Sequence, residues 1–278
     1  MGRRLPALAE LVNQMPDPDQ RGMYCTDIDK EKIERAVAQI HKGGIKSIQG
    51  IIDMLVTPGE GNDVKAHYAL HCLALHVCKL DDDSLRRRFA RTLASQLGGD
   101  RPKAVQAYLI QELQAVGGKE VAKAIGRALT DPELCEPAAQ ALVSIGEGAG
   151  EQLRGALPDA EGKCRLTIVQ NLGVVRDAGS VDALKDALGA ESPEIRLAAA
   201  WALANIGDSG SVDLLLKAAD AEGWERIQAT KACLVLAENL LEAGNRGQAM
   251  RIYRHLRDTR TDSSEQYIRD AAESALAG

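Results

Sequence analysis

Aromatic residues are scarce in this sequence. They make up 3% of its 278 residues, with one Phe, two Trp and five Tyr. A core with so few rings must be filled by Ala, Leu, Val and Ile, which suits closely stacked helices better than a β-sandwich or barrel. A chain of this length buries about three quarters of its unfolded surface, so folding requires neither a disulfide nor a metal. The composition therefore predicts a helical globular protein.

Cysteine pairs, long apolar runs and an export signal are also lacking. The six cysteines stand singly and no CxxC occurs, which indicates reduced, packed thiols. Cys25 lies outside the strong helical patterns and is the candidate for a reactive or docking thiol. No segment reaches the ~18 apolar residues that span a bilayer, and Glu10 interrupts the first apolar stretch. We therefore expect a cytoplasmic protein, unless an export signal has been removed, with no membrane contact.

An excess of positive charge is absent as well. The chain has 34 Lys and Arg against 40 Asp and Glu, so its net charge is −6. A net-acidic chain is not a general binder of nucleic acids or anionic membranes, although a local basic stripe can still bind phosphate.

The sequence contains an internal repeat. When residues 165–187 are laid over residues 196–218, an offset of 31, ten of 23 positions are identical without a gap. A more diverged copy lies at residues 137–146. Such self-similarity is typical of proteins built from stacked repeats.

Each repeat reads as two helices. In the clearest copy, apolar residues at helical spacing end at Gly207, and Ser211 then begins a second helix. Pro193 occupies the first turn, where proline is favoured. Neither helix can bury its apolar face alone, so neighbouring repeats must stack.

The periodicity predicts an all-α fold, a right-handed α-solenoid of about seven stacked antiparallel helix pairs with a C-terminal capping helix. Residues 1–27 are expected to form a loose N-terminal arm, residues 28–222 the repeats, and residues 223–278 a different helix pair and the cap of one continuous solenoid. The expected pairs are 29–41 with 45–56, 64–80 with 84–97, 102–116 with 119–129, 133–145 with 150–157, the two clear repeats, and 224–243 with 247–257, followed by a helix over 264–277.

The segment from Ser192 to Asp208 resembles a HEAT repeat, and more narrowly the short HEAT-like repeats named after phycobilisome lyases. An Arg follows the Pro-Glu opening, small residues fill the first helix, and Gly-Asp leads into a Leu-rich second helix. Residues 234–253 are similar instead to a tetratricopeptide unit, with Gly244, Ala249 and Tyr253 at the motif positions. The resemblance implies architecture and protein binding on the concave face of the second helices, and it implies no chemistry.

We therefore expect a non-enzymatic protein–protein interaction scaffold without a cofactor. The mixed charges of the polar second-helix positions predict a salt-sensitive contact with the partner. These positions are Lys119, Glu120, Lys123, Arg127, Gln152, Arg154, Asp182, Lys185, Asp186, Asp213 and Lys217.

A cluster of histidines and cysteines between residues 41 and 78 offers an alternative. His67 and His71 are spaced four apart on one helix face, with Cys78 seven further along, a spacing that suits a metal ion. The cluster also includes His41, Cys72 and His76. A metal-dependent or bilin-lyase-like enzyme is the alternative function, and packed, hydrogen-bonded histidines are the simpler interpretation.

Two arginine stripes suggest binding of phosphate or nucleic acid, although a solvated helix face explains both. Asp81–Asp83 can be read as a cation site but suits the start of a helix better. The stripes are Arg246, Arg251, Arg254, Arg257 and Arg260 with His255, and Arg86, Arg87 and Arg88 with Arg91.

Two further patterns have structural interpretations. The charges that recur in register, Arg165 with Arg196 and Asp177 with Asp208, predict a ladder of contacts between neighbouring repeats. Trp201 is expected in the core, and Trp224 is expected to cap the last helix pair.

Overall fold

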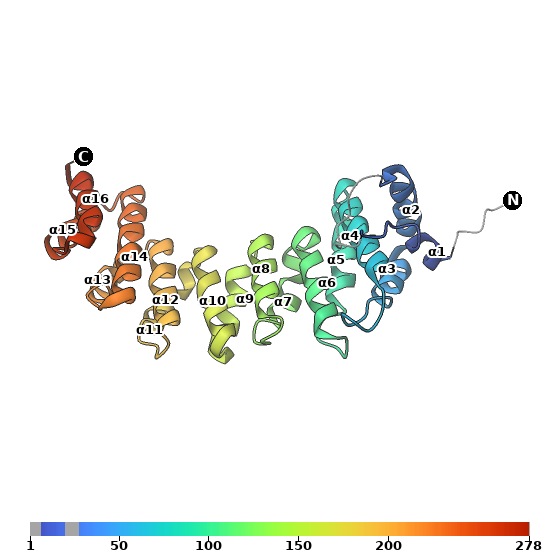
Figure 1. Cartoon of the computed structure of the whole chain (residues 1–278), viewed down its shortest axis with the longest axis horizontal. Helices are drawn as coiled ribbons and strands as arrows, with labels where there is room; N and C mark the ends of the chain where they lie inside the picture. The colour runs from blue at the N-terminus through green and yellow to red at the C-terminus, as the bar shows by residue number, and fades with distance from the viewer. Residues whose placement is uncertain (1–6, 20–27, 278) are drawn as a thin grey trace. The chain divides into compact units, whose positions relative to one another are not determined.

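A computed structural model describes residues 7–19 and 28–277 of the chain. In this part of the chain all regular secondary structure is helical (Figure 1). The helices group into two compact units, unit 1 (residues 1–148) and unit 2 (residues 149–278). The predicted all-α solenoid is confirmed. Within the described residues, no helix is both long enough and apolar enough to cross a membrane.

Unit 1 contains α1 (Leu8–Val12), α2 (Lys30–Lys42), α3 (Gly44–Ile52), α4 (Val64–Lys79), α5 (Asp83–Ala94), α6 (Lys103–Val116), α7 (Lys119–Gly126) and α8 (Cys135–Ile145). Unit 2 contains α9 (Ala149–Ala156), α10 (Gly162–Val174), α11 (Val181–Ala187), α12 (Pro193–Ile206), α13 (Val212–Ala218), α14 (Gly223–Glu242), α15 (Arg246–Thr259) and α16 (Gln266–Ala277).

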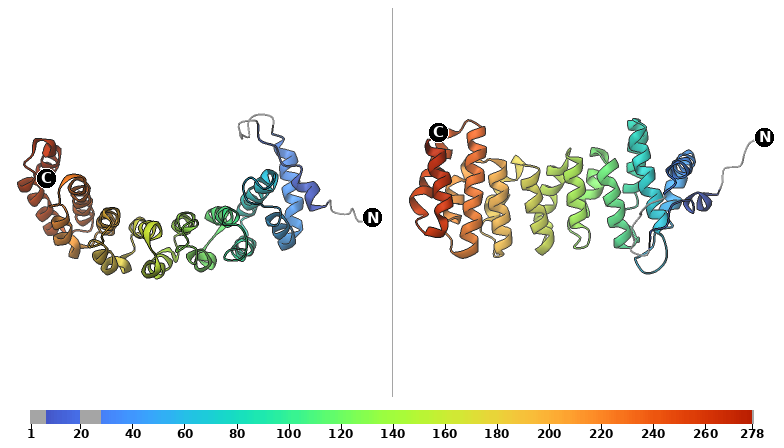
Figure 2. Two further views of the ribbon diagram at one scale, coloured as in Figure 1. Left: turned by 60° about the horizontal axis from the view of Figure 1, so that its bottom comes forward. Right: turned by 45° about the horizontal axis from the view of Figure 1, so that its top comes forward.

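Within each unit, helices pack against the equivalent helices of the next repeat. The first helices α4, α6 and α8 pack in succession in unit 1, as do α10, α12 and α14 in unit 2. The second helices α3, α5 and α7 pack in the same way. When the helices are viewed nearly end-on, the two layers of helices can be followed within each unit (Figure 2). The side chains exposed on the second-helix layer are therefore drawn from several repeats.

Helix α12 shows how the sequence specifies a repeat. The side chain of Ser192 accepts a hydrogen bond from the backbone N–H of Ile195 at 3.3 Å, and Pro193 fills the first turn. Gly207 ends the helix in the left-handed conformation, with φ of 78°. Both helix ends lie where the capping residues predict them.

The first helices of unit 2 approach each other closely because their contact residues are small. A Cβ atom added to Gly173 of α10 would lie 2.6 Å from the Cα atom of Ala202 on α12. Ala199 and Leu203 of α12 are buried as well. This close packing explains how a core with few rings fills its space.

The N-terminal segment differs from the expected loose arm. Residues 8–12 form α1, and Leu11, Val12 and Met15 are buried. Lys65 of α4 forms an ion pair with Asp17 at 3.0 Å. Residues 7–19 therefore pack on unit 1, while Cys25 lies outside the described residues.

The last helix pair continues the stack of unit 2. Helix α14 packs on α12 and α13, and α16 packs on α15 at the expected capping position. The likeness of this pair to a tetratricopeptide unit remains a prediction.

Candidate partner-binding site

Several predicted contact residues of unit 2 instead form ion pairs between neighbouring repeats. Arg154 of α9 pairs with Asp177, and Lys185 of α11 pairs with Asp208 at 2.9 Å. The two pairs are related by the same offset of 31 residues as the sequence repeat. The predicted ladder is thus confirmed for both aspartates.

Of the two arginines predicted to join neighbouring repeats, Arg165 and Arg196, only Arg196 forms such a contact. Arg196 of α12 donates three hydrogen bonds to the carboxylate of Glu225 on α14, at 2.7, 2.8 and 3.0 Å. In contrast, the Nε atom of Arg165 is buried without a hydrogen-bond partner. Repetition in sequence therefore predicted a structural role correctly at Arg196 but not at Arg165.

Other predicted contact residues are engaged in the same way. In unit 1, Lys119 pairs with Glu147 at 2.8 Å, and Glu120 accepts a hydrogen bond from Arg86 at 2.9 Å. In unit 2, Arg251 donates to Asp213. The predicted residues that form no ion pair with another described residue are Lys123, Arg127, Gln152, Asp182, Asp186 and Lys217.

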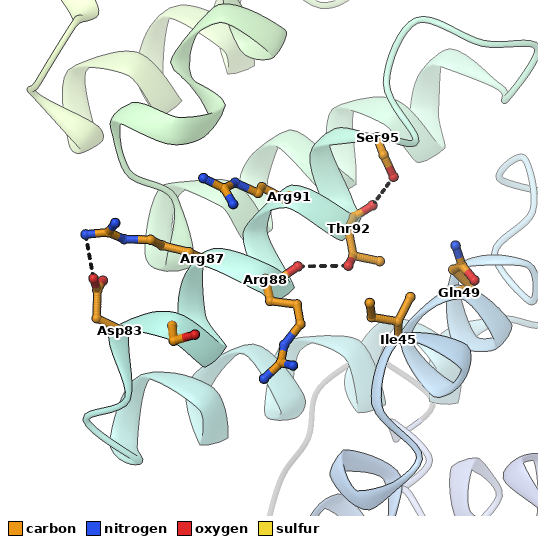
Figure 3. A pocket seen from close by; sticks show the side chains of 9 residues that line it. Ile45, Gln49, Asp83, Arg87, Arg88, Arg91, Thr92 and Ser95 are labelled. Atoms are coloured by element: carbon orange, nitrogen blue, oxygen red, sulfur yellow. Dashed lines mark hydrogen bonds and ion pairs between the residues drawn. The ribbon is translucent and has the colours of Figure 1, made fainter.

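The second-helix layer of unit 1 contains a hollow of about 640 Å³ between α3 and α5 (Figure 3). Exposed side chains of both helices line it, and three of them are arginines from α5. The lining residues are Ile45, Gln49, Asp83, Ser84, Arg87, Arg88, Arg91, Thr92 and Ser95. We call this hollow the basic groove.

Two of the three arginines are not neutralised. Arg87 pairs with Asp83 at 2.6 Å, whereas Arg88 and Arg91 form no ion pair with any described residue. Figure 3 shows the guanidinium groups of Arg88 and Arg91 pointing away from each other. A hydrogen bond from Arg86 lowers the pKa of the Asp83 carboxyl, so Asp83 is ionised. Its carboxylate is already paired with Arg86 and Arg87. The groove therefore offers two free cations.

An apolar hollow of about 630 Å³ adjoins the basic groove and shares Ile45 and Arg88 with it. Leu73, Val77 and Phe89 are among its apolar lining, which also includes Lys42 and Lys46. Together the two hollows have five Lys or Arg side chains and one carboxylate in their lining. The arginines stood out in the sequence, but the two lysines did not, because about 40 residues separate them from α5.

The predicted metal ligands each have a different partner. His67 lies 3.1 Å from Asp63, His71 lies 3.1 Å from Glu112, and the Sγ atom of Cys78 lies 3.6 Å from the carbonyl oxygen of Ala115. No group of three or more His, Cys, Asp or Glu side chains within the described ranges is arranged to hold a metal ion. The rings of His41 and His76 meet edge to face, with centroids 5.1 Å apart.

Glu112 of α6 is the buried centre of this region. Burial raises the pKa of its carboxyl, although the nearby His71 acts in the opposite direction. The Tyr108 hydroxyl donates to the carbonyl oxygen of His67 at 2.6 Å. Burial also raises the pKa of the Cys72 thiol, which disfavours the thiolate needed by a nucleophile or metal ligand.

The C-terminal arginine stripe is not a continuous cationic surface. Arg260 is fully buried and donates to the carbonyl oxygen of Ala219 at 2.7 Å. Arg251 and Arg257 pair with aspartates, which leaves Arg246 and Arg254 as the exposed members without an ion pair among the described residues. Only Arg260 of the predicted stripe is thus buried, and two of its five arginines remain exposed without an ion pair among the described residues.

The aspartates before α5 behave as predicted, whereas Trp201 does not. Asp82 caps α5 by accepting a hydrogen bond from the backbone N–H of Leu85 at 3.0 Å, in agreement with the helix-start interpretation. The core role of Trp201 is wrong, since 40% of this residue is exposed. Trp224 lies at the start of α14, where it is 58% exposed.

Comparison with known proteins identifies the repeats. Residues 150–234 match the family model for HEAT repeats. No curated protein matches the chain in sequence. The chain is similar to solved structures of an engineered protein (20% identity, TM-score 0.45, covering 96% of this chain and 78% of that chain) and of the complex of CpcE and CpcF of phycocyanin lyase from Nostoc sp. PCC7120 (15% identity, TM-score 0.38, covering 98% and 97%). It is also similar to human deoxyhypusine hydroxylase in complex with glycerol (17% identity, TM-score 0.32, covering 97% and 94%).

The matched region runs from α9 into α14 and contains the two copies related by the 31-residue offset. The all-helical stack, the capped helix pairs and the family match agree. Residues 150–234 are therefore identified as HEAT repeats.

Proposed function

We propose that the protein is a non-enzymatic interaction scaffold that binds an acidic segment of a partner protein in the basic groove between α3 and α5. The observation that carries this proposal is the pair of exposed guanidinium groups of Arg88 and Arg91, which have no carboxylate partner in the described chain.

The chemistry of the groove defines the partner segment. A guanidinium group binds a carboxylate through two parallel hydrogen bonds, so two free arginines favour two acidic side chains. The adjoining apolar hollow, with Ile45 43% exposed at its edge, accommodates one large apolar side chain. The expected ligand is therefore an acidic segment that carries an apolar anchor.

The next second helix extends the basic surface. Lys123 and Arg127, at the end of α7, are exposed and form no ion pair with described residues, and α7 packs on α5. A longer acidic segment can therefore continue from the groove onto α7. The remaining polar second-helix residues of unit 2, such as Asp182 and Asp186, stay candidates for a further contact.

Both alternatives to this proposal have less support. The three candidate metal ligands are each held by a different group, which favours packed histidines over a metal-dependent enzyme. Burial of Arg260 and pairing of Arg251 weaken the case for phosphate or nucleic-acid binding by the C-terminal stripe. The HEAT repeats themselves are typical of protein-interaction scaffolds.

The test is affinity capture from the source organism, with mass spectrometry of the recovered proteins. The groove variant is Arg88→Glu/Arg91→Glu, and the matched control is Arg246→Glu/Arg254→Glu, which makes the same charge change at exposed residues. Wild type and control should recover one stoichiometric partner, and the groove variant should recover about tenfold less of it. Circular dichroism should show equal helicity for all three proteins.

Equal recovery of the partner by the groove variant would contradict the proposal. Recovery of nucleic acid in place of protein by the wild type would contradict it as well.

A further inference from the structure

Two of the five histidines face each other at the contact of α2 with α4 in unit 1. His41, in the last turn of α2, and His76, in the last turn of α4, meet edge to face with ring centroids 5.1 Å apart. His41 also lines the apolar hollow beside the basic groove, and His76 lines a second hollow of about 400 Å³ between α2 and α4. The pair thus belongs to the walls of both hollows.

The surroundings of His41 and His76 differ from those of the other histidines. A carboxylate near an imidazole stabilises the protonated form of the ring. His41 and His76 form no ion pair with any described residue. The other three histidines each lie 3.1–3.7 Å from a carboxylate, and the pairs are His67 with Asp63, His71 with Glu112 and His255 with Asp220.

One ring nitrogen of the facing pair is buried without a partner. The Nδ1 atom of His41 has no hydrogen bond within the described chain. A protonated imidazole carries an N–H group on both nitrogens, so protonation of His41 would leave a charged donor buried and unpaired. Burial lowers the pKa of His76, and His41 and Lys79 act in the same direction. The folded arrangement therefore accommodates two neutral imidazoles better than two charged ones.

The charged side chains around the pair are mostly cations, which oppose a further positive charge. Glu34 of α2 is exposed and is the one carboxylate in either lining, and burial raises the pKa of the neutral Cys72 and Tyr68. Helix α1 contributes no charged residue to either lining, and Glu112 of α6 is paired with His71. The cations in the two linings are Lys30 and Lys42 of α2, Lys46 of α3, Lys79 of α4 and Arg88 of α5.

We propose that the contact between His41 and His76 is a pH-sensitive switch, in which acid charges the two rings and separates the end of α2 from α4. The chain continues from α2 through Gly43 and Gly44 into α3, and both glycines line the apolar hollow. Separation of α2 from α4 therefore opens one wall of this hollow. Release of the partner's apolar anchor in acid is the consequence, and that consequence rests on the proposed function of the basic groove.

The direction of the effect follows from the linkage between protonation and folding. The folded pKa of His76 is lowered, so the unfolded chain binds the proton more tightly than the folded chain does. The stabilising contribution of the contact is complete above the unfolded pKa of 6.5 and is lost as pH falls through the lower folded value.

Hydrogen exchange of the full-length protein, measured by mass spectrometry, tests the switch without a partner. Exchange is compared at about pH 7.5 and about pH 5.5, which span the range in which histidine changes charge, and is corrected for the intrinsic rate at each pH. Protection of peptides from α2 and the α2–α3 turn should fall about tenfold in acid, as one pKa unit of linkage requires. Peptides from α12 should keep their protection.

Variants assign the effect to the histidine pair. His76→Gln keeps a hydrogen-bonding side chain that takes up no proton, so α2 should stay protected at both pH values. His76→Lys carries a fixed charge and should loosen α2 already at neutral pH, with helicity by circular dichroism close to that of wild type. The matched control is His255→Gln in α15 of unit 2, which should show the same loosening of α2 in acid as wild type does.

Partner capture at the same two pH values tests the consequence for binding. Wild type should recover several-fold less partner at the lower pH, whereas His76→Gln should recover equal amounts. Failure of the basic-groove proposal would leave the exchange result unchanged, so the two failures are distinguishable. Equal protection of α2 at both pH values in wild type would overturn the inference. Loosening in acid that persists in His76→Gln would overturn it as well, because another group would then be responsible.

Discussion

Glu112 shows how a single buried carboxyl makes stability depend on pH. It is buried beside Tyr108 and His71, with Cys72 and His67 also close, and burial raises the pKa of its carboxyl. A raised pKa means that the fold favours the protonated form. The stabilising contribution is therefore complete below the unfolded pKa of about 4.5 and is lost as pH rises through the higher folded value.

Replacing this carboxyl with an amide should remove the effect. Glu112→Gln keeps a hydrogen-bonding group of the same shape but cannot ionise, so its free energy of unfolding relative to wild type should rise between pH 4.5 and neutral pH. We expect a gain of the order of 1 kcal/mol, measured by urea unfolding at both pH values. A variant that loses stability relative to wild type over this range would show that the ionised pair with His71 is net stabilising.

Arg260 differs sharply from the other arginines of its stripe. Its guanidinium group donates to the carbonyl oxygen of Ala219 at 2.7 Å and to the Thr230 hydroxyl at 3.3 Å. Burial lowers the pKa of Arg260, and the nearby Arg226 acts in the same direction. The buried charge of Arg260 is therefore stabilised by these two acceptors.

Removal of the Arg260 side chain should be strongly destabilising. Arg260→Ala leaves a cavity and unpaired buried acceptors, so we expect a loss of about 3 kcal/mol in the free energy of unfolding. Arg254→Ala, at an exposed position of α15, should change stability by less than about 0.5 kcal/mol. Chemical unfolding of both variants measures the difference, and similar values for the two would refute a structural role for Arg260.

Helical spacing did not separate Arg260 from Arg257, because both belong to one polar pattern in the sequence. Arg260 is buried against Ala219, directly after α13, and Thr230 of α14, which lie 41 and 30 residues away in the chain. The exposure of Trp201 was missed for a related reason. Its spacing fits an apolar helix face, yet 40% of the residue is exposed in the folded chain.

At the scale of helices and turns, ion pairs join consecutive repeats. Burial raises the pKa of Asp208, but hydrogen bonds from Ser211 and Lys185 outweigh burial, so the net pKa is lowered. The stabilising contribution of Asp208 is therefore present above the unfolded pKa of 3.8 and is lost as pH falls through the lower folded value.

Loss of this charge should weaken unit 2 at neutral pH only. We expect Asp208→Asn to lower the free energy of unfolding by about 1 kcal/mol, with the difference from wild type disappearing below the unfolded pKa. Asp186→Asn, at an exposed residue of α11 without an ion pair among described residues, is the matched control. A Asp208→Asn effect that persists undiminished in acid would mean that the side chain acts through shape rather than charge.

Sequence patterns predicted most of the helices but not α1. Helix α12 has a capping Ser192, a first-turn Pro193 and a closing Gly207, so its ends were evident. Helix α1 is five residues long, which is too short to be stable alone. It is held by packing, since the Leu8 side chain lies so near Gly50 that a Cβ atom there would be 2.5 Å from it. Local sequence carries no sign of that contact.

At the scale of the whole molecule, the net charge of −6 conceals a basic surface. The sequence predicted partner binding on second helices, but many of the residues chosen there are engaged between repeats. The basic groove instead has Arg88 and Arg91 of α5 in its lining, and Lys46 of α3 lines the adjoining apolar hollow. Only the packing of α3 against α5 brings these cations together, which periodicity within one helix cannot show.

Site-specific photo-crosslinking tests the central claim most directly. A photoreactive residue replaces Gln49, exposed in the basic groove, or Asp186, exposed on a second helix of unit 2. After irradiation in cells of the source organism, the Gln49 position should give one dominant product, and mass spectrometry should place the crosslink in an acidic segment of a partner protein. A partner captured only from the Asp186 position would contradict the assignment of the binding site to the basic groove.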